Sequence, residues 1–331
     1  MNYFEEYENK NILITGGAGC IGSNLTKKLS NLQASKIIIL DDLSASERWN
    51  IPDEPNVVFI EGSILDEKRV KRVFSEKIDY VFHLAAHFAN QNSVDHPETD
   101  LLVNGLGTLK LLQYSQMTKI PKFIFASSGC SVYGSQNPLP LKEDYVSINL
   151  DTPYQITKLL GELYCNFFYN YYRLPIVILR FFNVYGPGEI PGKYRNVIPN
   201  FIYRAMHKKK LPITGTGEET RDFTFVKDAV DGILRGGVIS EAVGEAFNIA
   251  SQTETKVIDL ANIINELLEN PNGIEFIEKR KWDKITKRCA SIEKARKILG
   301  YNPKTQIKEG IKKTIDWFLS NNEKIEESAI F

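Results

Sequence analysis

Tyr154 and Lys158 are the two residues whose types and spacing best suit acid–base chemistry. They stand four residues apart, so in a helix both side chains lie on one face. Tyrosine has an ordinary pKa near 10 and accepts a proton poorly at neutral pH, whereas a nearby ammonium lowers that pKa by stabilising the phenolate. A chain of 331 residues with 15 Tyr has about one such pair by chance. The elements around the pair must therefore support its chemistry.

A glycine pattern near the N-terminus has the setting of a dinucleotide-binding turn. The apolar stretch 11–15 predicts a buried strand, a helical pattern follows, and three glycines stand at the junction: Gly16, Gly19 and Gly22. Glycines at this spacing allow a tight turn and let the backbone approach a pyrophosphate at the helix N-terminus. The next predicted strand, 36–40, ends at Asp41, where a carboxylate suits the ribose hydroxyls of NAD and repels the 2′-phosphate of NADP.

Strands and helices alternate along the first half of the chain. Apolar runs predict further strands at 57–60, 80–86, 122–126 and 176–180, with helices at 67–74, 100–117 and 154–172 between them. This order is typical of an α/β Rossmann-type fold, a doubly wound parallel sheet that binds ligands at the carboxyl ends of its strands. We expect an NAD-binding Rossmann domain at 1–180, to which a segment at about 225–250 returns. Residues 181–331 are expected to form a smaller, interleaved C-terminal substrate-binding α/β region.

Composition narrows the possible classes of function. Lys+Arg and Asp+Glu are both 41, and a net charge of zero argues against a nucleic-acid-binding or membrane-surface protein. No apolar run reaches the length of a membrane span. The four Cys have no paired spacing and the four His have no ligand cluster around them. We therefore expect free thiols, a cytoplasmic protein and no metal site.

Together with later motifs, these features resemble the extended short-chain dehydrogenase/reductase family, in particular its NAD-dependent nucleotide-sugar epimerases and dehydratases. The similarity runs from about residue 10 to residue 319 and is greatest to UDP-sugar 4-epimerases. Besides the glycine loop and the Tyr/Lys pair, it rests on Asp41-Asp42-Leu43-Ser44, His83-Leu84-Ala85-Ala86, Val132-Tyr133-Gly134, Arg180-Phe181-Phe182-Asn183-Val184-Tyr185-Gly186-Pro187, Asn196-Val197-Ile198-Pro199, Thr220-Arg221-Asp222-Phe223, and Arg280 with Asp283.

The resemblance implies roles for individual residues. Tyr154 would be the catalytic phenol, and Lys158 would hold the nicotinamide ribose and lower the pKa of Tyr154. The cofactor-binding positions would be Gly16, Gly19, Cys20, Ile21, Gly22, Asp41, Asp42, Leu43, Ser44, Ser63, Ile64, Leu84, Ala85, Ala86, Asn104, Tyr154, Lys158 and Phe182. The substrate-binding positions would be His87, Ser128, Asn183, Asn196, Val197, Arg221, Arg280 and Asp283.

Two positions depart from the family pattern. The segment before Val132 is one residue longer than usual, so Ser127, Ser128 and Ser131 compete to be the third catalytic hydroxyl, and we favour Ser128. Many relatives hold adenine with an Asp where this chain has Ser63. A serine still forms hydrogen bonds, so NAD binding remains expected.

The resemblance implies an enzyme that epimerises a UDP-sugar at C4 through a transient 4-keto intermediate. Related 4,6-dehydratases and decarboxylases carry carboxylates where this chain has Gly129, Cys130 and Ser131, which favours epimerisation. A 3,5-epimerase is an alternative, because Cys130 and Lys193 are similar to the acid–base pair of a related mannose epimerase. A reductase, or a silent NAD-binding assembly protein, is a further alternative. The resemblance also implies a homodimer in which the helices at 100–117 and 154–172 pair across a two-fold axis.

Overall fold

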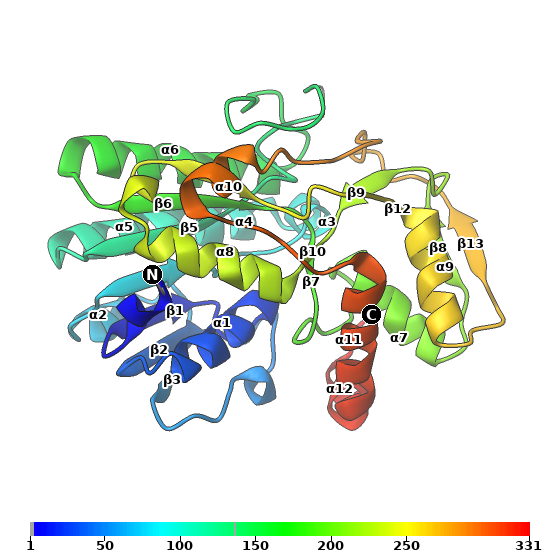
Figure 1. Ribbon diagram of the computed structural model, residues 1–331, viewed down its shortest axis with the longest axis horizontal. Helices are drawn as coiled ribbons and strands as arrows, with labels where there is room; N and C mark the ends of the chain where they lie inside the picture. The colour runs from blue at the N-terminus through cyan, green and yellow to red at the C-terminus, as the bar shows by residue number, and fades with distance from the viewer. Residues whose placement is uncertain (1–2, 136) are drawn as a thin grey trace.

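A seven-stranded parallel sheet forms the centre of the computed structural model, which describes residues 3–135 and 137–331 (Figure 1). The order of its strands is β11-β6-β5-β4-β1-β2-β3. Their bounds are β1 (Asn11–Thr15), β2 (Lys36–Asp41), β3 (Val57–Glu61), β4 (Tyr80–His83), β5 (Lys122–Ser128), β6 (Ile176–Phe181) and β11 (Ala246–Ile249). The expected α/β fold with a doubly wound parallel sheet is confirmed.

Helices pack on both faces of this sheet, which explains why its strands are continuous apolar runs. One hydrophobic core lies under α1 (Cys20–Asn31) and α8 (Val226–Val238), and the other under α2 (Glu67–Phe74), α5 (Thr108–Met117) and α6 (Pro153–Tyr172). The helix expected at 100–117 is continuous in the structure. It contains α4 (Pro97–Asp100), a π-helical stretch at Leu101–Gly107, and α5.

The strand order reverses between β1 and β4. From β1 the chain builds outward through β2 and β3, and it then returns to place β4, β5, β6 and β11 on the other side of β1. Ligands of open parallel sheets bind outside the carboxyl ends of the strands at such a reversal. The glycine loop after β1 and the segment after β4 therefore meet at the expected ligand site.

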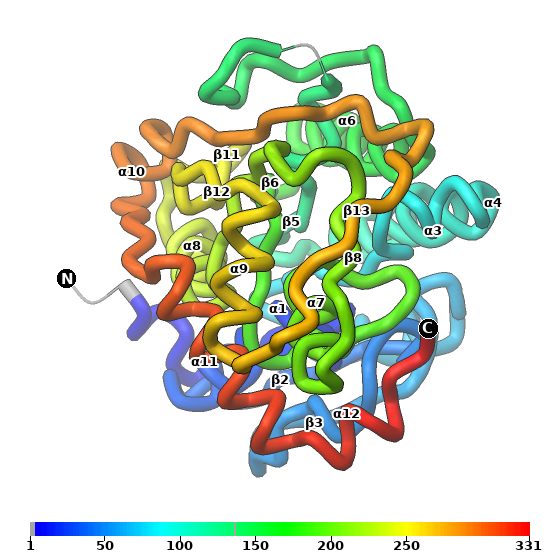
Figure 2. The backbone as a smooth tube through the Cα atoms, turned by 90° about the vertical axis from the view of Figure 1, so that its right-hand side faces the viewer, coloured from blue at the N-terminus to red at the C-terminus, as the bar shows by residue number. Residues whose placement is uncertain are grey.

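The remaining elements form a second cluster beside the sheet, facing the viewer in Figure 2. Here α7 (Val197–Met206) and α9 (Val257–Leu267) pack with the parallel pair β8 (Leu211–Thr214) and β13 (Ile274–Ile277). Two more small pairs are β9 (Thr220–Asp222) with β12 (Glu254–Lys256), and β7 (Val184–Tyr185) with β10 (Thr224–Phe225). The chain ends in α10 (Glu293–Leu299), α11 (Ile307–Ser320) and α12 (Asn322–Ser328).

Several elements differ from the sequence-based expectation. Strand β4 ends at His83, because the N–H of Ala85 donates to the Thr15 hydroxyl (3.3 Å) as the chain turns toward the glycine loop. The segment 181–195 was expected to be loop but contains β7. The sequence patterns also missed α3 (Asn90–Asp95), β12, β13 and α12. Over the described residues, no helix combines the length and apolar character needed to cross a membrane.

Candidate active site

The glycine loop between β1 and α1 is too tightly packed for side chains. Gly16 has a φ of +73°, and a Cβ there would lie 2.7 Å from the backbone nitrogen of Ala85. A Cβ on Gly22 would lie 2.3 Å from the carbonyl oxygen of Gly16. Helix α1 begins at Cys20 after Gly19, which provides no side-chain cap. Its first N–H groups are therefore available for an anion, and the loop fits the pyrophosphate of a dinucleotide.

Asp41 joins the glycine loop to the turn after β2. It is buried, and its carboxylate accepts hydrogen bonds from the N–H groups of Ala18 (3.0 Å) and Leu43 (2.9 Å). Burial raises the pKa of Asp41, and these hydrogen bonds act in the opposite direction. Asp42 is exposed and accepts from Ser44. Of the two carboxylates, Asp41 is the one fixed beside the loop.

His83 connects three elements under the site and remains neutral. Its Nδ1 lies 2.8 Å from the Thr15 hydroxyl and its Nε2 lies 2.9 Å from the Thr108 hydroxyl. Burial lowers the pKa of His83 to about 3, and the positive charge of Lys158 adds to this effect. The imidazole therefore holds β4 against β1 and α5, as part of the scaffold.

Helix α6 brings Tyr154 and Lys158 together as their spacing predicts. The helix begins after Thr152, whose hydroxyl accepts a hydrogen bond from the N–H of Gln155. Both Tyr154 and Lys158 are buried, and Lys158 Nζ lies 5.7 Å from the centroid of the Tyr154 ring. The ammonium also donates to the carbonyl oxygen of Ala126 (2.9 Å), which places it against the end of β5.

The three candidate serines have different partners. The Ser127 hydroxyl donates to Glu162, which lies about two helical turns further along α6 than Tyr154. The Ser128 hydroxyl is placed so that it lowers the pKa of Tyr154. The Ser131 hydroxyl donates to that of Ser128 (2.9 Å) and so lies one step further away. The choice of Ser128 as the third catalytic hydroxyl stays a prediction.

Burial is the largest effect on the pKa values of both residues of the pair. Burial raises the pKa of Tyr154 far above its usual value, the charges of Asp100 and Cys130 raise it further, and the Ser128 hydrogen bond lowers it. Burial lowers the pKa of Lys158 to about 8, while Asp100 and Glu162 act in the opposite direction. The lowering of the Tyr154 pKa by Lys158 therefore stays a prediction.

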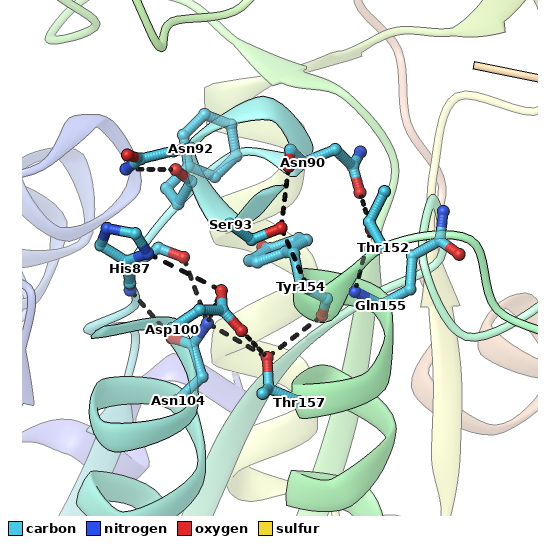
Figure 3. Close-up of polar contacts among 11 residues, drawn as sticks. His87, Asn90, Asn92, Ser93, Asp100, Asn104, Thr152, Tyr154, Gln155 and Thr157 are labelled. Atoms are coloured by element: carbon cyan, nitrogen blue, oxygen red, sulfur yellow. Dashed lines mark hydrogen bonds and ion pairs between the residues drawn. The ribbon is translucent and has the colours of Figure 1, made fainter. Parts of the chain in front are cut away.

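A buried network around Asp100 supports this face of the site (Figure 3). The hydroxyl of Thr157 donates to Asp100 Oδ2 (2.6 Å), and Asn104 Nδ2 donates to Asp100 Oδ1 (2.9 Å). The amide oxygen of Asn104 accepts from the backbone N–H of His87 (2.8 Å), and His87 Nδ1 lies 3.7 Å from Asp100 Oδ1. Asn104 therefore fixes the loop after β4. Sequence reasoning missed Asp100, although its spacing from Asn104 is one helical turn.

Gly129 directly follows β5, and its lack of a side chain makes room for the ring of Phe182. A Cβ at this position would lie 1.9 Å from Cε2 of Phe182. The N–H of Gly129 donates to the carbonyl oxygen of Phe181 (2.9 Å). This hydrogen bond opposes a shift of the Gly129 backbone away from the Phe182 ring. The ring of Phe182 consequently fills the place where a side chain at position 129 would extend.

We expect Gly129→Ala to lower both stability and turnover, because the new methyl group displaces the Phe182 ring. Overpacking of this kind costs about 1–3 kcal/mol of unfolding free energy. Urea unfolding and steady-state kinetics measure the two effects. Gly236→Ala is the control, because a Cβ there meets its nearest atom, Leu179 Cδ2, at 3.3 Å within a helix. Equal stability of the two variants would contradict the packing account.

Most of the residues that we expect to bind substrate lie at or near one cavity. Val197 and Arg280 line this cavity of about 480 Å³. Arg221 forms an ion pair with Asp283 (3.4 Å), and Asn183 Nδ2 donates to the carbonyl oxygen of Asp222 (3.2 Å). Asn196 precedes α7, and its amide donates to the buried carboxylate of Glu189 (2.7 Å) instead of capping the helix.

The cavity is strongly cationic and partly aromatic. Among the described residues that line it no side chain is a carboxylate, whereas five side chains are cationic: Lys193, Arg195, Arg204, Lys209 and Arg280. Tyr203, Phe201 and Phe331 contribute aromatic rings to its lining. A cavity with this lining suits a ligand that combines a flat base with phosphate groups.

Sequence reasoning missed Arg288, which braces the turn after β5. It is buried and donates to the carbonyl oxygens of Cys130 and Gly134, at 3.1 Å each. Burial raises the pKa of the Cys130 thiol, and the positive charges of Arg288 and Arg221 oppose this. Lys193, the suggested partner of Cys130, instead places its Nζ 4.8 Å from the ring centroid of Tyr194.

Comparison with known proteins identifies the family of the chain and agrees with its fold. The family model for the NAD-dependent epimerase/dehydratase family matches residues 12–250. The chain belongs to this family. The resemblance seen in the sequence and the expected cofactor, NAD, are thereby confirmed.

Relatives of known sequence carry out more than one reaction. A putative UDP-glucose 4-epimerase of Methanocaldococcus jannaschii is 34% identical, with 94% of this chain and 99% of that protein aligned. A dTDP-D-glucose 4,6-dehydratase of Bos taurus is 36% identical, with 94% of this chain and 89% of that protein aligned. The protein is thus an enzyme of the nucleotide-sugar epimerase/dehydratase class, and membership alone does not select the reaction.

Solved structures show the same fold over almost the whole chain. Epimerase Mth375 from Methanothermobacter thermautotrophicus is 57% identical, with a TM-score of 0.99 over 100% of this chain and 98% of that one. The UDP-glucose 4-epimerase of Thermotoga maritima, solved with UDP-glucose, is 34% identical, with a TM-score of 0.89 over 94% and 99% of the two chains.

Proposed function

We propose that the protein is an NAD-dependent UDP-sugar 4-epimerase that works through a transient 4-keto intermediate. The observation that carries this proposal is the segment beside Tyr154, which presents Ser128, Gly129 and Cys130 and no carboxylate. Elimination of water or loss of a carboxyl group needs an acid–base group at a second carbon of the sugar. The ring of Phe182 leaves no room for such a side chain at position 129.

In the proposed reaction the residues of the chain handle one proton. The Tyr154 phenolate takes the proton from O4 of the sugar and later returns it, and the Ser128 hydroxyl donates a hydrogen bond to O4. Lys158, held as an ammonium, stabilises the phenolate. NAD, when bound, supplies the oxidation and the reduction at C4. Because burial raises the pKa of Tyr154, the positive nicotinamide ring is expected to contribute to forming the phenolate.

We further propose that residues 181–331 hold the nucleotide sugar. The cationic cavity of about 480 Å³ suits the nucleotide diphosphate, with Arg280 and Val197 in its lining. Arg221 and Arg280 would contact the phosphates, Asp283 the ribose of the nucleotide, and Asn183 the sugar diphosphate. His87 would line the opposite wall after β4. The rest of the proposed assignment is unchanged: residues 1–180 hold NAD, and four free thiols fit a cytoplasmic enzyme.

The proposal is tested by incubating the purified protein with UDP-glucose, UDP-glucuronate and their N-acetyl relatives and following the sugars by proton NMR. We expect one substrate to reach an equilibrium mixture with its C4 epimer, without net formation of NADH. A 4-keto-6-deoxy sugar, a pentose, or no conversion of any of them would contradict the proposal. A Cys130→Ala variant with full turnover would also exclude the 3,5-epimerase alternative.

We also propose that the enzyme is a homodimer. Helix α6 carries large apolar side chains on its exposed face at helical spacing: Ile156, Leu163, Phe167 and Tyr171. The neighbouring helical segment adds Leu102, Leu106 and Met117. In Figure 1, α5 and α6 lie side by side at one edge of the molecule. Two copies would bury these faces as a four-helix arrangement.

Phe167→Glu is expected to convert this dimer into a monomer, because each copy would place a charge in the apolar interface. Sedimentation equilibrium at micromolar protein measures the mass. Ile148→Glu is the control, since Ile148 is 88% exposed in the loop before α6 and belongs to neither helix. A monomeric unmodified protein, or a dimer that survives Phe167→Glu, would exclude this interface.

A further inference from the structure

The segment 322–331 joins the cofactor side of the molecule to the cationic cavity. It contains α12 and three following residues, and in Figure 1 α12 stands between the N-terminal strands and α7. Ile325 anchors it in the hydrophobic core with 1% of its surface exposed. The proposed reaction at C4 does not use this segment.

On the cofactor side, the segment contacts the turn that follows β2. Trp49 Nε1 donates to the Ser328 hydroxyl (3.1 Å), and Lys324 Nζ lies 5.5 Å from the centroid of the Trp49 ring. The next residue, Asn50, donates to the carbonyl oxygens of Ala18 in the glycine loop (2.7 Å) and of Gly188 (3.0 Å). The segment is thus two contacts away from the pyrophosphate-binding turn.

On the other side, the segment contacts the wall of the cavity. Tyr203 donates to Glu326 Oε2 (2.9 Å), and His207 Nε2 lies 3.1 Å from Glu326 Oε1. The N–H of Lys193 donates to the carbonyl oxygen of Ile330 (2.9 Å). These contacts connect the segment 322–331 to α7, to the residue that follows α7, and to the loop that precedes α7.

Phe331 is the part of the segment that reaches the cavity itself. Its ring lies 5.1 Å from the ring of Tyr203, at an interplanar angle of 31°, and both residues line the cavity. Phe331 nevertheless remains 62% exposed. A large apolar ring that is held in place but left uncovered, beside five cationic side chains, is a suitable surface for a nucleotide base.

We propose that Phe331 contacts the base of the nucleotide sugar, and that the segment 322–331 holds it there as a clasp between the cofactor loop and the cavity. This inference rests on the proposed function, because it takes the cavity as the nucleotide site. It adds a binding residue that lies beyond the sequence range of the family resemblance, which ends near residue 319.

The experiment compares two probes by calorimetry on the purified full-length chain: UDP, which has a base, and inorganic pyrophosphate, which has none. Phe331→Ala should weaken UDP binding by about 5- to 100-fold, the range expected for loss of one base–aromatic stack. It should leave pyrophosphate binding unchanged, because the cations remain. Phe331→Trp should restore UDP binding. Phe276→Ala is the control, since Phe276 is 56% exposed on β13 but does not line the cavity.

A second variant tests the clasp. Glu326→Ala removes the contacts with Tyr203 and His207 and should also weaken UDP binding, with Phe331 still present. Unchanged UDP binding in Phe331→Ala, or equal weakening of UDP and pyrophosphate, would overturn the role of Phe331. Unchanged binding in Glu326→Ala would overturn the clasp. If the unmodified chain binds pyrophosphate but not UDP, the proposed function fails instead.

Discussion

Tyr154→Phe lowers turnover by about 100- to 10,000-fold, the usual contribution of a positioned acid–base group. The phenylalanine ring keeps the packing of a side chain that is 7% exposed, but it has no hydroxyl to exchange a proton with O4. Bound NAD and UDP affinity should stay the same, because neither depends on that proton. Steady-state kinetics, the cofactor content after purification and calorimetry with UDP measure the three quantities.

The matched control for this variant is Tyr172→Phe, which removes a hydroxyl from the same helix at a position that is 44% exposed and outside the proposed dimer face. It should retain full activity. Substantial turnover by Tyr154→Phe would remove the phenol from its proposed role. Loss of NAD or of folded protein in that variant would show that the hydroxyl has a structural function.

Glu162→Gln has the largest expected effect on stability. Glu162 and Arg180 are both buried, with Arg180 Nε 2.9 Å from Glu162 Oε1 and Nη2 2.7 Å from Oε2. Burial disfavours the charge of Arg180, but Glu162 outweighs it and raises the pKa of the guanidinium. Removing one partner of a buried pair leaves the other charge uncompensated, which costs about 3–5 kcal/mol.

Urea unfolding measures this loss of free energy of unfolding. Glu309→Gln breaks an exposed pair with Lys313 one helical turn away and should change the free energy by about 0.5 kcal/mol or less. A similarly small change in Glu162→Gln would mean that Arg180 finds compensation elsewhere, for example from Tyr133, whose hydroxyl lies 3.0 Å from its Nη1.

The central sheet could be predicted because each of its strands is a short apolar run between turn or helix signals. The helix expected at 67–74 has the bounds of α2, since its apolar period and its capping Asp66 agree. Strand β13 escaped notice because it packs along one edge and exposes Phe276 and Ile277, so its burial does not alternate. Helix α12 is short and mostly polar, with Ile325 as its one fully buried residue.

Site residues that belong to a local motif could be expected from the sequence. Residues whose place depends on the pairing of two strands could not. The register of β5 with β6 sets Ser127 opposite Arg180, and this commits Ser127 to the Glu162 network and leaves Ser128 for Tyr154. No local pattern contains that register. The raised pKa of Tyr154 was also hidden, because it results from burial by distant parts of the chain.

The most direct test of the proposed epimerisation follows a label at the reacting carbon. The UDP-sugar that is converted fastest is prepared with deuterium at C4 and incubated with the enzyme in ordinary water. If the carbon is oxidised and reduced in place, proton and deuterium NMR will show the C4 epimer with the label still on C4. Loss of the label to water, or its appearance on another carbon, would contradict the account.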